Sequence, residues 1–317
     1  MYFKYEVDEL NSGRTVMSIL KHEFGFSRGL VKKLKSNGRV LCNGMPVFMT
    51  DIVKYGDIVE VYLDFDETSE DIAPTEMELN VLYEDDALIA LDKPPGLITH
   101  PVSSNLYNTI ANGLVYYFQK KGQRVRVRPV SRLDKDTSGI IVFAKNQFIQ
   151  DRLTRQMLSN IYHKEYLGIV HGCPKASEGT IDLPIARVPG STMLRMISEE
   201  GARCITHYKV IEVLKDAAVL RFVLETGRTH QIRVHCKAIG HPLIGDTLYS
   251  DIPTDLISRQ ALHSHFVRFI HPLSGKPVKI RSEPPEDMDK LLKALGSQSL
   301  DQGSIDPQAF HTGKPPG

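Results

Sequence analysis

Apolar residues recur with two different periods along the chain, and each period predicts a type of secondary structure. In the first 63 residues, helical spacing occurs twice and is followed by strand patterns. An Asn-Gly pair between two of these strand patterns is typical of a β-hairpin turn. The expected elements are helices within residues 13–25 and 27–38, the second ending at Gly38, a hairpin over 39–49 and a strand over 57–63.

Strand patterns dominate the chain from about residue 79 to residue 285. The expected strands are a hairpin over 79–94 that turns at residues 84–86, then 139–145, 166–172, 204–214 and 217–227. An amphipathic helix is expected over 146–160, with Phe148, Leu153, Met157 and Leu158 on its apolar face. Because strands and helices do not alternate regularly, we predict an α+β fold with a mixed, mainly antiparallel sheet and flanking helices.

The segments between these patterns predict the domain organisation. Residues 64–78 contain seven acids, no base and a proline, which indicates an extended acidic linker that leaves the preceding unit mobile. Residues 286–317 begin with a short helical pattern and end in a Gly-, Pro- and Ser-rich tail that we expect to be disordered. The predicted division is therefore 1–63, the linker 64–78, a main domain 79–285 and the tail 286–317.

Charge is balanced overall, at +1 for 317 residues, so an acidic partner would have to bind local basic patches. One patch lies in the second predicted helix and after it, and the other lies just before residue 131. A solvated helix face is the alternative interpretation for the first patch. The bases that we expect to contact phosphate are Arg28, Lys32, Lys33 and Arg39 in the first patch and Arg124, Arg126 and Arg128 in the second.

Four widely spaced cysteines without a C-x-x-C pair argue against a disulfide framework and fit a reducing compartment. The start of the chain carries acids and no apolar segment typical of a signal peptide. No run of apolar residues is long enough to span a bilayer. The sequence therefore predicts a soluble, cytoplasmic protein, and nothing in it requires more than a monomer.

A dense polar cluster, SRLDKDTSG at residues 131–139, comes immediately before a strand pattern that we expect to be buried. Asp134 lies between Arg132 and Lys135, and such flanking cations keep a carboxylate ionised despite partial burial. The cluster is either a surface turn with local ion pairs or the edge of an active site. These nine residues alone do not separate the two interpretations.

A second polar segment, residues 224–246, predicts a helix that Thr229 caps and that runs to Gly240. Its apolar face carries Ile232, Cys236 and Ile239. The opposite face carries His230, Arg233 and Lys237, which are spaced to meet a carboxylate or a phosphate, or else only solvent. An arginine of this helix that faces Asp134 would favour the active-site interpretation.

Two further features bear on chemistry. Tyr162 and Tyr166 flank an apolar strand, where tyrosine is more often part of the core but can also stack on a base or accept a proton. The twelve histidines lack a metal-binding spacing, because His230 and His235 are five apart and no acid follows His263 and His265 closely. We therefore expect no metal site.

Five separated motifs resemble the RluA-type pseudouridine synthases in the order found in that family. They are VLYEDDALIALDKPPGLITHP, RLDKDTSGIIVFAK, YLGIV, TGRTHQIRVHCKAIGHPLIGDTLY and LHSHFVRFIHPLSGK. The match extends over about residues 79–285. Residues 1–63 resemble the small RNA-binding domain named after the fourth ribosomal protein of the small subunit, which precedes the catalytic domain in several members.

The resemblance implies isomerisation of uridine to pseudouridine in RNA without a cofactor. It makes Asp134 the catalytic aspartate, Arg233 its arginine partner and Tyr166 the tyrosine that stacks on uracil or accepts the C5 proton. Arg132 would help to displace the target nucleotide from the RNA stack. Ser131 departs from the family, whose members usually carry histidine there. The implied RNA contacts are Arg132, Arg228 and His230, together with the seven bases of the two patches.

The expected substrate is the ribosomal RNA of the large subunit, in preference to transfer RNA. Two alternatives stay open at this point. A binding protein, such as an RNA chaperone or ribosome-assembly factor, would fit the basic N-terminal unit. A metal-dependent hydrolase acting on RNA would lose its activity in EDTA.

Overall fold

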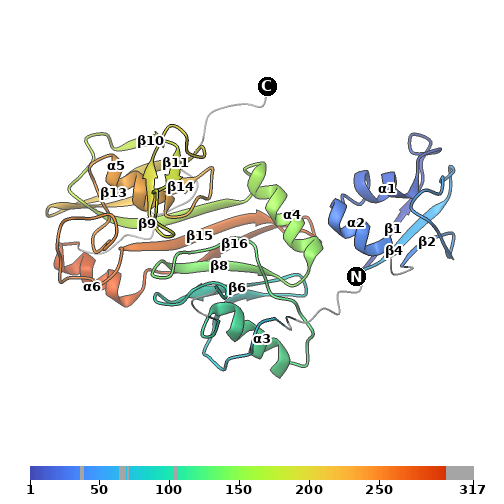
Figure 1. The fold of residues 1–317 in the computed structure, drawn as a ribbon, viewed down its shortest axis with the longest axis horizontal. Helices are drawn as coiled ribbons and strands as arrows, with labels where there is room; N and C mark the ends of the chain where they lie inside the picture. The colour runs from blue at the N-terminus through green and yellow to red at the C-terminus, as the bar shows by residue number, and fades with distance from the viewer. Residues whose placement is uncertain (36–38, 64–68, 70, 103–105, 298–317) are drawn as a thin grey trace.

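Two separate β-sheets organise the chain, one in the N-terminal part and a larger one in the remainder (Figure 1). The computed structural model describes residues 1–35, 39–63, 69, 71–102 and 106–297. Among the described strands the single parallel pairing joins β8 (Ser138–Ala144) to β15 (Leu262–Ile270). The expected α+β class, with a mixed and mainly antiparallel sheet, is confirmed.

The N-terminal sheet has four strands in the order β1-β4-β2-β3, accompanied by two helices. Asn43 and Gly44 both have positive φ, as the tight turn between β2 and β3 requires. The predicted hairpin and later strand are confirmed, whereas β1 was not expected. The end of the second helix, predicted at Gly38, lies outside the described residues. The elements are β1 (Tyr2–Glu6), α1 (Val16–His22), α2 (Arg28–Lys35), β2 (Val40–Cys42), β3 (Met45–Pro46) and β4 (Ile58–Tyr62).

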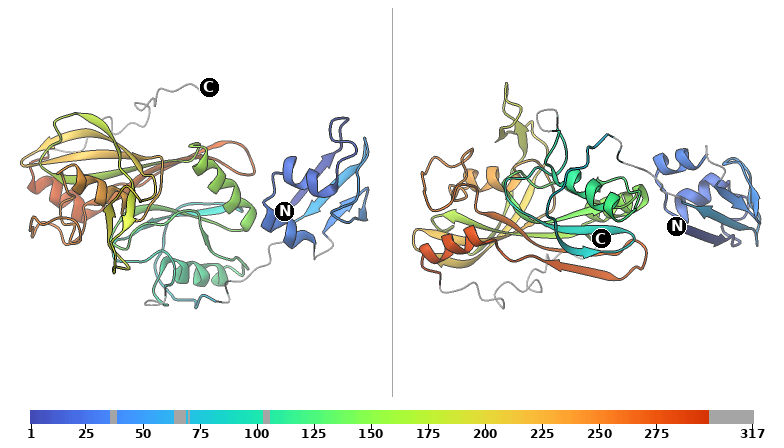
Figure 2. Two further views of the ribbon diagram at one scale, coloured as in Figure 1. Left: turned by 45° about the horizontal axis from the view of Figure 1, so that its top comes forward. Right: turned by 90° about the horizontal axis from the view of Figure 1, so that it is seen from below.

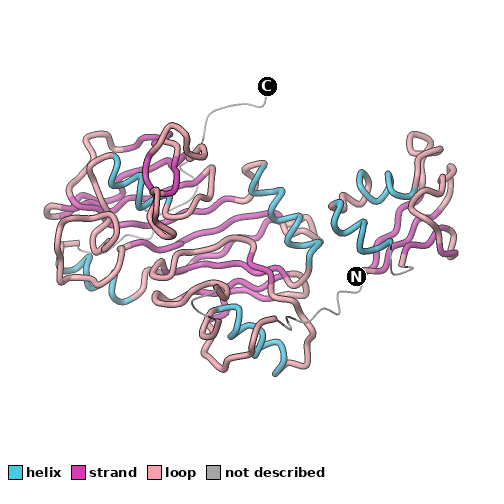
Figure 3. Tube along the Cα trace, in the orientation of Figure 1, coloured by secondary structure: helices cyan, strands magenta, loops and turns pink. Residues whose placement is uncertain are grey.

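The large sheet has ten strands, eight of them in the order β10-β13-β14-β9-β15-β8-β6-β5, with β16 paired to β15 and β7 to β8. Figure 3 shows these strands as the body of the molecule, with helices against them. The strands not yet given are β5 (Asn80–Glu84), β6 (Leu88–Lys93), β7 (Arg128–Pro129), β9 (His163–His171), β10 (Glu178–Asp182), β13 (Ile205–Leu214), β14 (Ala217–Leu224) and β16 (Pro277–Arg281). A separate hairpin consists of β11 (Ile185–Arg187) and β12 (Arg195–Ile197).

Helices cover the large sheet on both faces. On one face, α3 (Ile110–Lys120) and α5 (Gln231–Ala238) share a hydrophobic cluster with Tyr166 and Phe222. On the other face, α4 (Gln147–Leu158) packs against Val142, and α6 (Glu286–Ala294) packs against Ile169. Residues 166 and 169 point to opposite faces because side chains alternate along a strand. The sheet therefore has one face with α3 and α5 and another with α4 and α6.

Three helices differ from the sequence predictions. The apolar face of α4 includes Phe148 and Leu153, but Leu158 is 83% exposed, so its assignment to that face was wrong. The cap of α5 is His230 and not Thr229, because His230 has left-handed backbone angles and the helix starts after it. Helix α3 was missed because Asn112 and Gly113 weaken the helical pattern. This glycine leaves room for the side chain of Met77, which would lie only 2.5 Å from a Cβ atom added there.

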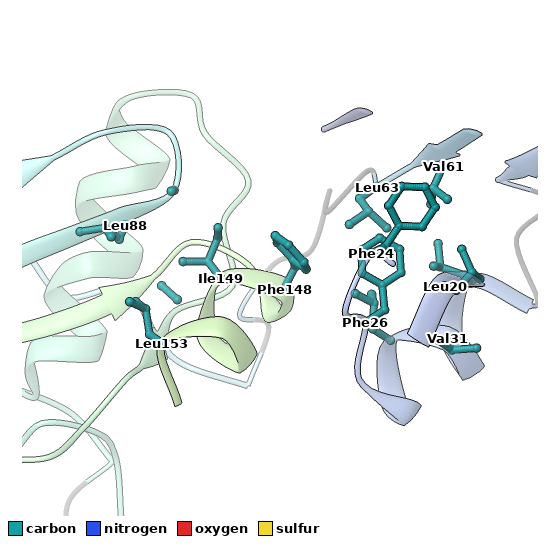
Figure 4. Close-up of a cluster of buried hydrophobic side chains, with 14 of the residues drawn as sticks. Leu20, Phe24, Phe26, Val31, Val61, Leu63, Leu88, Phe148, Ile149 and Leu153 are labelled. Atoms are coloured by element: carbon teal, nitrogen blue, oxygen red, sulfur yellow. The ribbon is translucent and has the colours of Figure 1, made fainter. Parts of the chain in front are cut away.

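The N-terminal unit lies beside α4 (Figure 2) and contacts it through an aromatic cluster that includes Phe26 and Phe148 (Figure 4). The ring of Phe148 lies 5.1 Å from that of Phe3 and 5.5 Å from that of Phe26, both edge-on. Arg152 of the same helix donates a hydrogen bond of 2.9 Å to the backbone oxygen of Phe24. The two parts of the chain therefore share buried apolar surface in addition to their linker. The mobility that we expected from the acidic linker stays a prediction.

Gly139, at the start of β8, provides a test of the central strand pairing. Its φ is +103°, and a Cβ built there would lie 2.3 Å from the backbone oxygen of Ser264. We expect Gly139→Ala to lower the free energy of unfolding by about 3 kcal/mol or more, because backbone strain adds to a backbone clash. Urea denaturation followed by circular dichroism measures this loss.

Gly96→Ala is the matched control, because Gly96 also has a positive φ, +87°, but nothing lies within 4 Å of the added atom. Strain alone is expected to cost about 1 kcal/mol there. Equal losses in the two variants would contradict the close approach of β8 to β15.

Candidate active site

The register of three adjacent strands brings distant parts of the sequence together at the centre of the large sheet. Ser264 of β15 lies opposite Gly139 of β8 on one side and opposite Tyr166 of β9 on the other. Asp134 lies on the loop that leads into β8, and β14, the neighbour of β9, leads through a short loop into α5. The loop, the tyrosine and the helix therefore meet at one place.

Arg233 of α5 lies between two carboxylates. Its Nε and Nη2 donate to Oδ2 and Oδ1 of Asp246, both at 2.7 Å, and its Nη1 lies 3.4 Å from Oδ2 of Asp134. The Asp246 side chain is fully buried, whereas the Asp134 side chain is 25% exposed. Asp246 is therefore the tight structural partner of the guanidinium, and Asp134 is its looser and more accessible partner.

The charge of Arg233 is secured by these carboxylates. Burial by itself lowers the pKa of Arg233, but the hydrogen bonds and negative charge of Asp246, with the charge of Asp134, outweigh burial and raise it. The guanidinium is therefore a permanent positive charge beside Asp134. Paired with two carboxylates, it leaves the group of three with one net negative charge.

Lys93, whose side chain is fully buried at the end of β6, holds the loop that carries Asp134. Its ammonium donates to the backbone oxygens of Pro94, Leu97 and Lys135, at 2.9, 3.0 and 2.8 Å. Burial lowers the pKa of Lys93 to about 7. Three carbonyl acceptors, however, can all be satisfied only by the protonated amine, and we regard it as protonated in this site.

Three further contacts fix the same loop. The Thr99 hydroxyl donates to the backbone oxygen of Leu133 at 3.3 Å, and Arg259 donates to that of Asp136 at 3.0 Å. The backbone N–H of Thr137 donates to the backbone oxygen of Asp134 at 3.2 Å, which closes a turn. Asp134 thus belongs to a braced turn with its side chain at the rim of the site.

Tyr166 is buried, with 6% of the residue exposed, on the sheet face that carries α5. Burial raises the pKa of Tyr166, and the nearby charge of Asp134 raises it further. The phenol is therefore neutral at ordinary pH and offers a ring face and an O–H group. Tyr162, the other tyrosine considered from the sequence, is stacked on Phe269 in the core of the opposite face.

The remaining expected contacts near Asp134 fall into two groups. Arg132 and Arg228 are exposed; Arg132 lies two residues before Asp134 and Arg228 just before α5. His230, in contrast, has a side chain only 12% exposed, and its Nε2 lies 3.9 Å from Oδ2 of Asp134. The structure thus brings Asp134, Tyr166, His230 and Arg233 together.

The two basic patches lie close to each other across the boundary between the two sheets. Burial lowers the pKa of Lys33, and so do the positive charges of Arg128, Arg126 and Arg39. Such mutual influence requires these cations to be near one another, although α2 and the segment before β8 are some ninety residues apart in sequence. Arg28 and Lys32 on α2 and Arg124 are exposed.

Sequence reasoning missed Lys93, Asp246 and Tyr249, which support the site. Lys93 and Asp246 each end an apolar run, ALIALDK and HPLIGD, where a charge needs a buried partner. That signal could have found them. No comparable signal marked Tyr249, whose hydroxyl lies 2.8 Å from Nδ1 of His230 in the folded chain.

Neither a metal site nor a membrane span is apparent in the described part of the chain. No three or more histidine, cysteine, aspartate or glutamate side chains gather there as metal ligands would. His263 and His265 share a face of β15, and both contact the backbone oxygen of Ser282. None of the described helices combines the length and apolarity needed to cross a bilayer.

Comparison with known proteins identifies the family. Residues 87–238 match the family described as RNA pseudouridylate synthase. The uncharacterized RNA pseudouridine synthase YjbO of Bacillus subtilis is 38% identical over 86% of this chain and 96% of that relative. Ribosomal large subunit pseudouridine synthase D of Xanthomonas campestris is 36% identical over 92% of both chains.

A solved structure agrees in fold. Human RNA pseudouridylate synthase domain containing 4 superposes with a TM-score of 0.57 at 22% identity, over 68% of this chain and 92% of that one. The braced aspartate, its arginine and the buried tyrosine therefore lie within a family match that extends along most of the sequence. The chain belongs to the RNA pseudouridine synthases and is an isomerase that acts on RNA.

Proposed function

We propose that this enzyme isomerises specific uridines in large-subunit ribosomal RNA, with Asp134 as its catalytic carboxylate and without a cofactor. The observation that carries the proposal is the contact of Asp134 with Arg233 at 3.4 Å, beside Tyr166 and partly open to solvent. A purely structural ion pair has no need for an exposed carboxylate, because Asp246 already satisfies the guanidinium.

The reaction breaks an N-glycosidic bond, turns the freed uracil and joins its C5 to the ribose. Asp134 could attack the ribose, attack the uracil ring or remove a ribose proton. Each of these roles requires an ionised and correctly oriented carboxylate. Arg233 holds a positive charge beside this carboxylate, and its bidentate anchor to Asp246 keeps the guanidinium from closing fully on Asp134.

Tyr166 is best suited to hold the uracil while it turns. Its pKa is raised by burial and by Asp134, so the phenol must first lose its own proton before it can accept the C5 proton. A neutral aromatic ring stacks on a base without that cost. Arg132, exposed two residues before Asp134, is the candidate to occupy the space that the displaced nucleotide leaves in the RNA.

The basic residues provide the contacts to the RNA backbone. We infer that residues 1–63 form an RNA-binding domain and 79–285 the catalytic domain. The Lys33 group, with Arg39, Arg126 and Arg128, would follow the phosphates across both. Arg28 and Lys32, with Arg124 and Arg228, would extend this surface. The relative named ribosomal large subunit pseudouridine synthase D supports the choice of RNA. A monomer in the cytoplasm stays our expectation.

Replacement of Asp134 by asparagine tests the catalytic assignment. Formation of pseudouridine expels the hydrogen at C5, so tritium release from RNA labelled at uridine C5 measures turnover. We expect Asp134→Asn to lower the rate by at least about 10³-fold, because asparagine can neither attack nor take up a proton. RNA affinity should change by less than about threefold.

Asp136→Asn is the control for this experiment, since it removes another carboxylate of the same loop while leaving the backbone contacts in place. It should keep most of the activity. Turnover by Asp134→Asn at the rate of the wild type would refute the assignment. Release from transfer RNA but not from large-subunit transcripts would refute the choice of substrate.

Asp246→Asn tests the anchoring of Arg233. Loss of one charge from a buried bidentate pair should lower the free energy of unfolding by about 3 kcal/mol. It should also lower kcat about tenfold, because the guanidinium then pairs more tightly with Asp134. Denaturation and tritium release measure the two effects. The control Asp251→Asn removes the acid of an exposed pair with Lys237 and should leave both unchanged.

Charge removal from α2 tests the RNA surface. The double substitution Arg28→Gln and Lys32→Gln should weaken RNA binding and reduce the slope of log affinity against log salt by about 1 to 2. The rate at saturating RNA should stay the same. The pair Lys4→Gln and Lys54→Gln, exposed residues of the same unit outside α2, serves as control. An equal effect of both pairs would show that only net charge matters.

A further inference from the structure

Tyr249 lies where three parts of the catalytic site meet. The residue is 5% exposed and packs with Val234 of α5 and with Leu194 and Ile197 of the β11–β12 hairpin. Its ring lies 5.1 Å from the guanidinium carbon of Arg233, and its backbone N–H donates to Asp246. Tyr249 therefore touches the helix, the hairpin and the anchor of Arg233 at once.

The hydrogen bonds of the Tyr249 hydroxyl determine where its proton points. The backbone N–H of Arg195 in β12 donates to this oxygen at 2.9 Å. The only other contact of the hydroxyl among the described residues is Nδ1 of His230, at 2.8 Å. The hydroxyl proton is thus free to be donated to Nδ1. A neutral histidine that accepts at Nδ1 carries its own proton on Nε2.

The Nε2 atom of His230 faces Asp134. The separation from Oδ2 is 3.9 Å, too long for a hydrogen bond in the resting enzyme but within reach of a small closing movement. The backbone of His230 has φ 59° and ψ 19°, a left-handed conformation that costs free energy for a residue with a side chain. Strain of this kind persists where the surroundings hold a side chain in a functional orientation.

His230 is neutral under ordinary conditions, so its tautomer matters. Burial lowers the pKa of His230, the charges of Arg233 and Arg195 lower it further, and those of Asp134 and Asp246 oppose them. The Tyr249 hydroxyl, which donates to the unprotonated Nδ1, favours the neutral form as well. In that form, one tautomer presents an N–H to Asp134 and the other presents a lone pair.

We propose that Tyr249 is a positioning residue for the reaction: its hydroxyl fixes the His230 imidazole with Nε2–H toward Asp134 and fastens the β11–β12 hairpin to the same site. The inference rests on the proposed role of Asp134. The proposal gives His230 a contact with the Asp134 carboxylate, in addition to the RNA contact expected for this histidine. Through Tyr249, the position of the β11–β12 hairpin would then affect the orientation of the His230 ring beside Asp134.

Tyr249→Phe removes the hydroxyl and keeps the ring over Arg233. Without the donor, the pKa of His230 rises, and the neutral ring can place its proton on Nδ1. Imidazolium carries both protons, so Nε2–H returns as the pH falls through the pKa. In tritium-release assays we expect kcat to be about five- to tenfold below wild type at about pH 8.5, with KM within about twofold. The deficit should shrink as the pH falls through the pKa of His230.

Three variants make the result specific. Tyr117→Phe loses a hydroxyl bond of 2.6 Å to Glu84, remote from Asp134, and should match wild type at every pH. His230→Gln carries a fixed amide donor and has no tautomer. Adding Tyr249→Phe to the His230→Gln variant should therefore cause no pH-dependent loss of kcat. Asp134→Asn reports on the proposed function itself, because activity in that variant would overturn both proposals together.

Other outcomes refute the positioning role alone. If Asp134→Asn is inactive while Tyr249→Phe equals wild type, or shows the same deficit at all pH values, the role of Tyr249 is wrong and that of Asp134 stands. A direct measurement needs no altered tyrosine. The ¹⁵N shifts of labelled histidine, assigned by comparison with His230→Gln, should show the Nε2–H tautomer in the full-length enzyme. The Nδ1–H tautomer would overturn the proposal.

Discussion

The bidentate contact of Arg233 with Asp246 is the interaction on which the rest of the site depends. A guanidinium buried without a partner costs several kcal/mol, and a guanidinium paired only with Asp134 would neutralise that carboxylate. Two carboxylates around one cation avoid both outcomes. One of them is fully buried and satisfies the cation, while the other keeps an accessible negative charge. Because Asp246 already satisfies Arg233, the carboxylate of Asp134 is left free for the catalytic role that we propose for it.

Rigid surroundings complete this arrangement from two sides. Lys93 and Arg259 donate to the backbone oxygens of the Asp134 loop, so the loop is fixed through its peptide groups and not through its carboxylate. On the other side, helix α5 begins after the strained residue His230, whose imidazole contacts the hydroxyl of Tyr249. The carboxylate lies between two braced elements and makes few bonds itself.

The fold class, the N-terminal hairpin and the candidate residues of the site could be predicted from the sequence, because each depends on a local sequence pattern. Strand and helix periods indicated the α+β class, and the Asn-Gly pair located a hairpin whose residues have the required positive φ. Asp134 and Arg233 were expected to face each other and do so at 3.4 Å. Flanking charge and helical spacing marked both residues as candidates, but only the resemblance to the pseudouridine synthases made Arg233 the partner of Asp134.

The parts that escaped prediction depend on tertiary contacts. Helix α3 has a glycine that local propensity disfavours and that Met77 requires. Leu158 follows the apolar pattern of α4 but is its last residue and is exposed. Tyr249 acts through a helix, a hairpin and a backbone N–H that come together only in the folded chain. The periodicity of apolar residues within one segment contains no information about tertiary contacts between distant segments.

The pairing of β8 with β15 also affects when the enzyme becomes active during its synthesis. The side chain of Ser138 contacts the imidazole of His263, 125 positions later in the chain, and the neighbouring Gly139 lies against Ser264. A growing chain that ends before β15 already contains Asp134, Tyr166 and Arg233, but the strand between the first two is still missing. Pairing over such a separation in sequence is slow, because the long loop must close first. If Asp134 and Tyr166 act as proposed, we expect the nascent polypeptide to lack modifying activity until β15 has emerged from the ribosome that makes it.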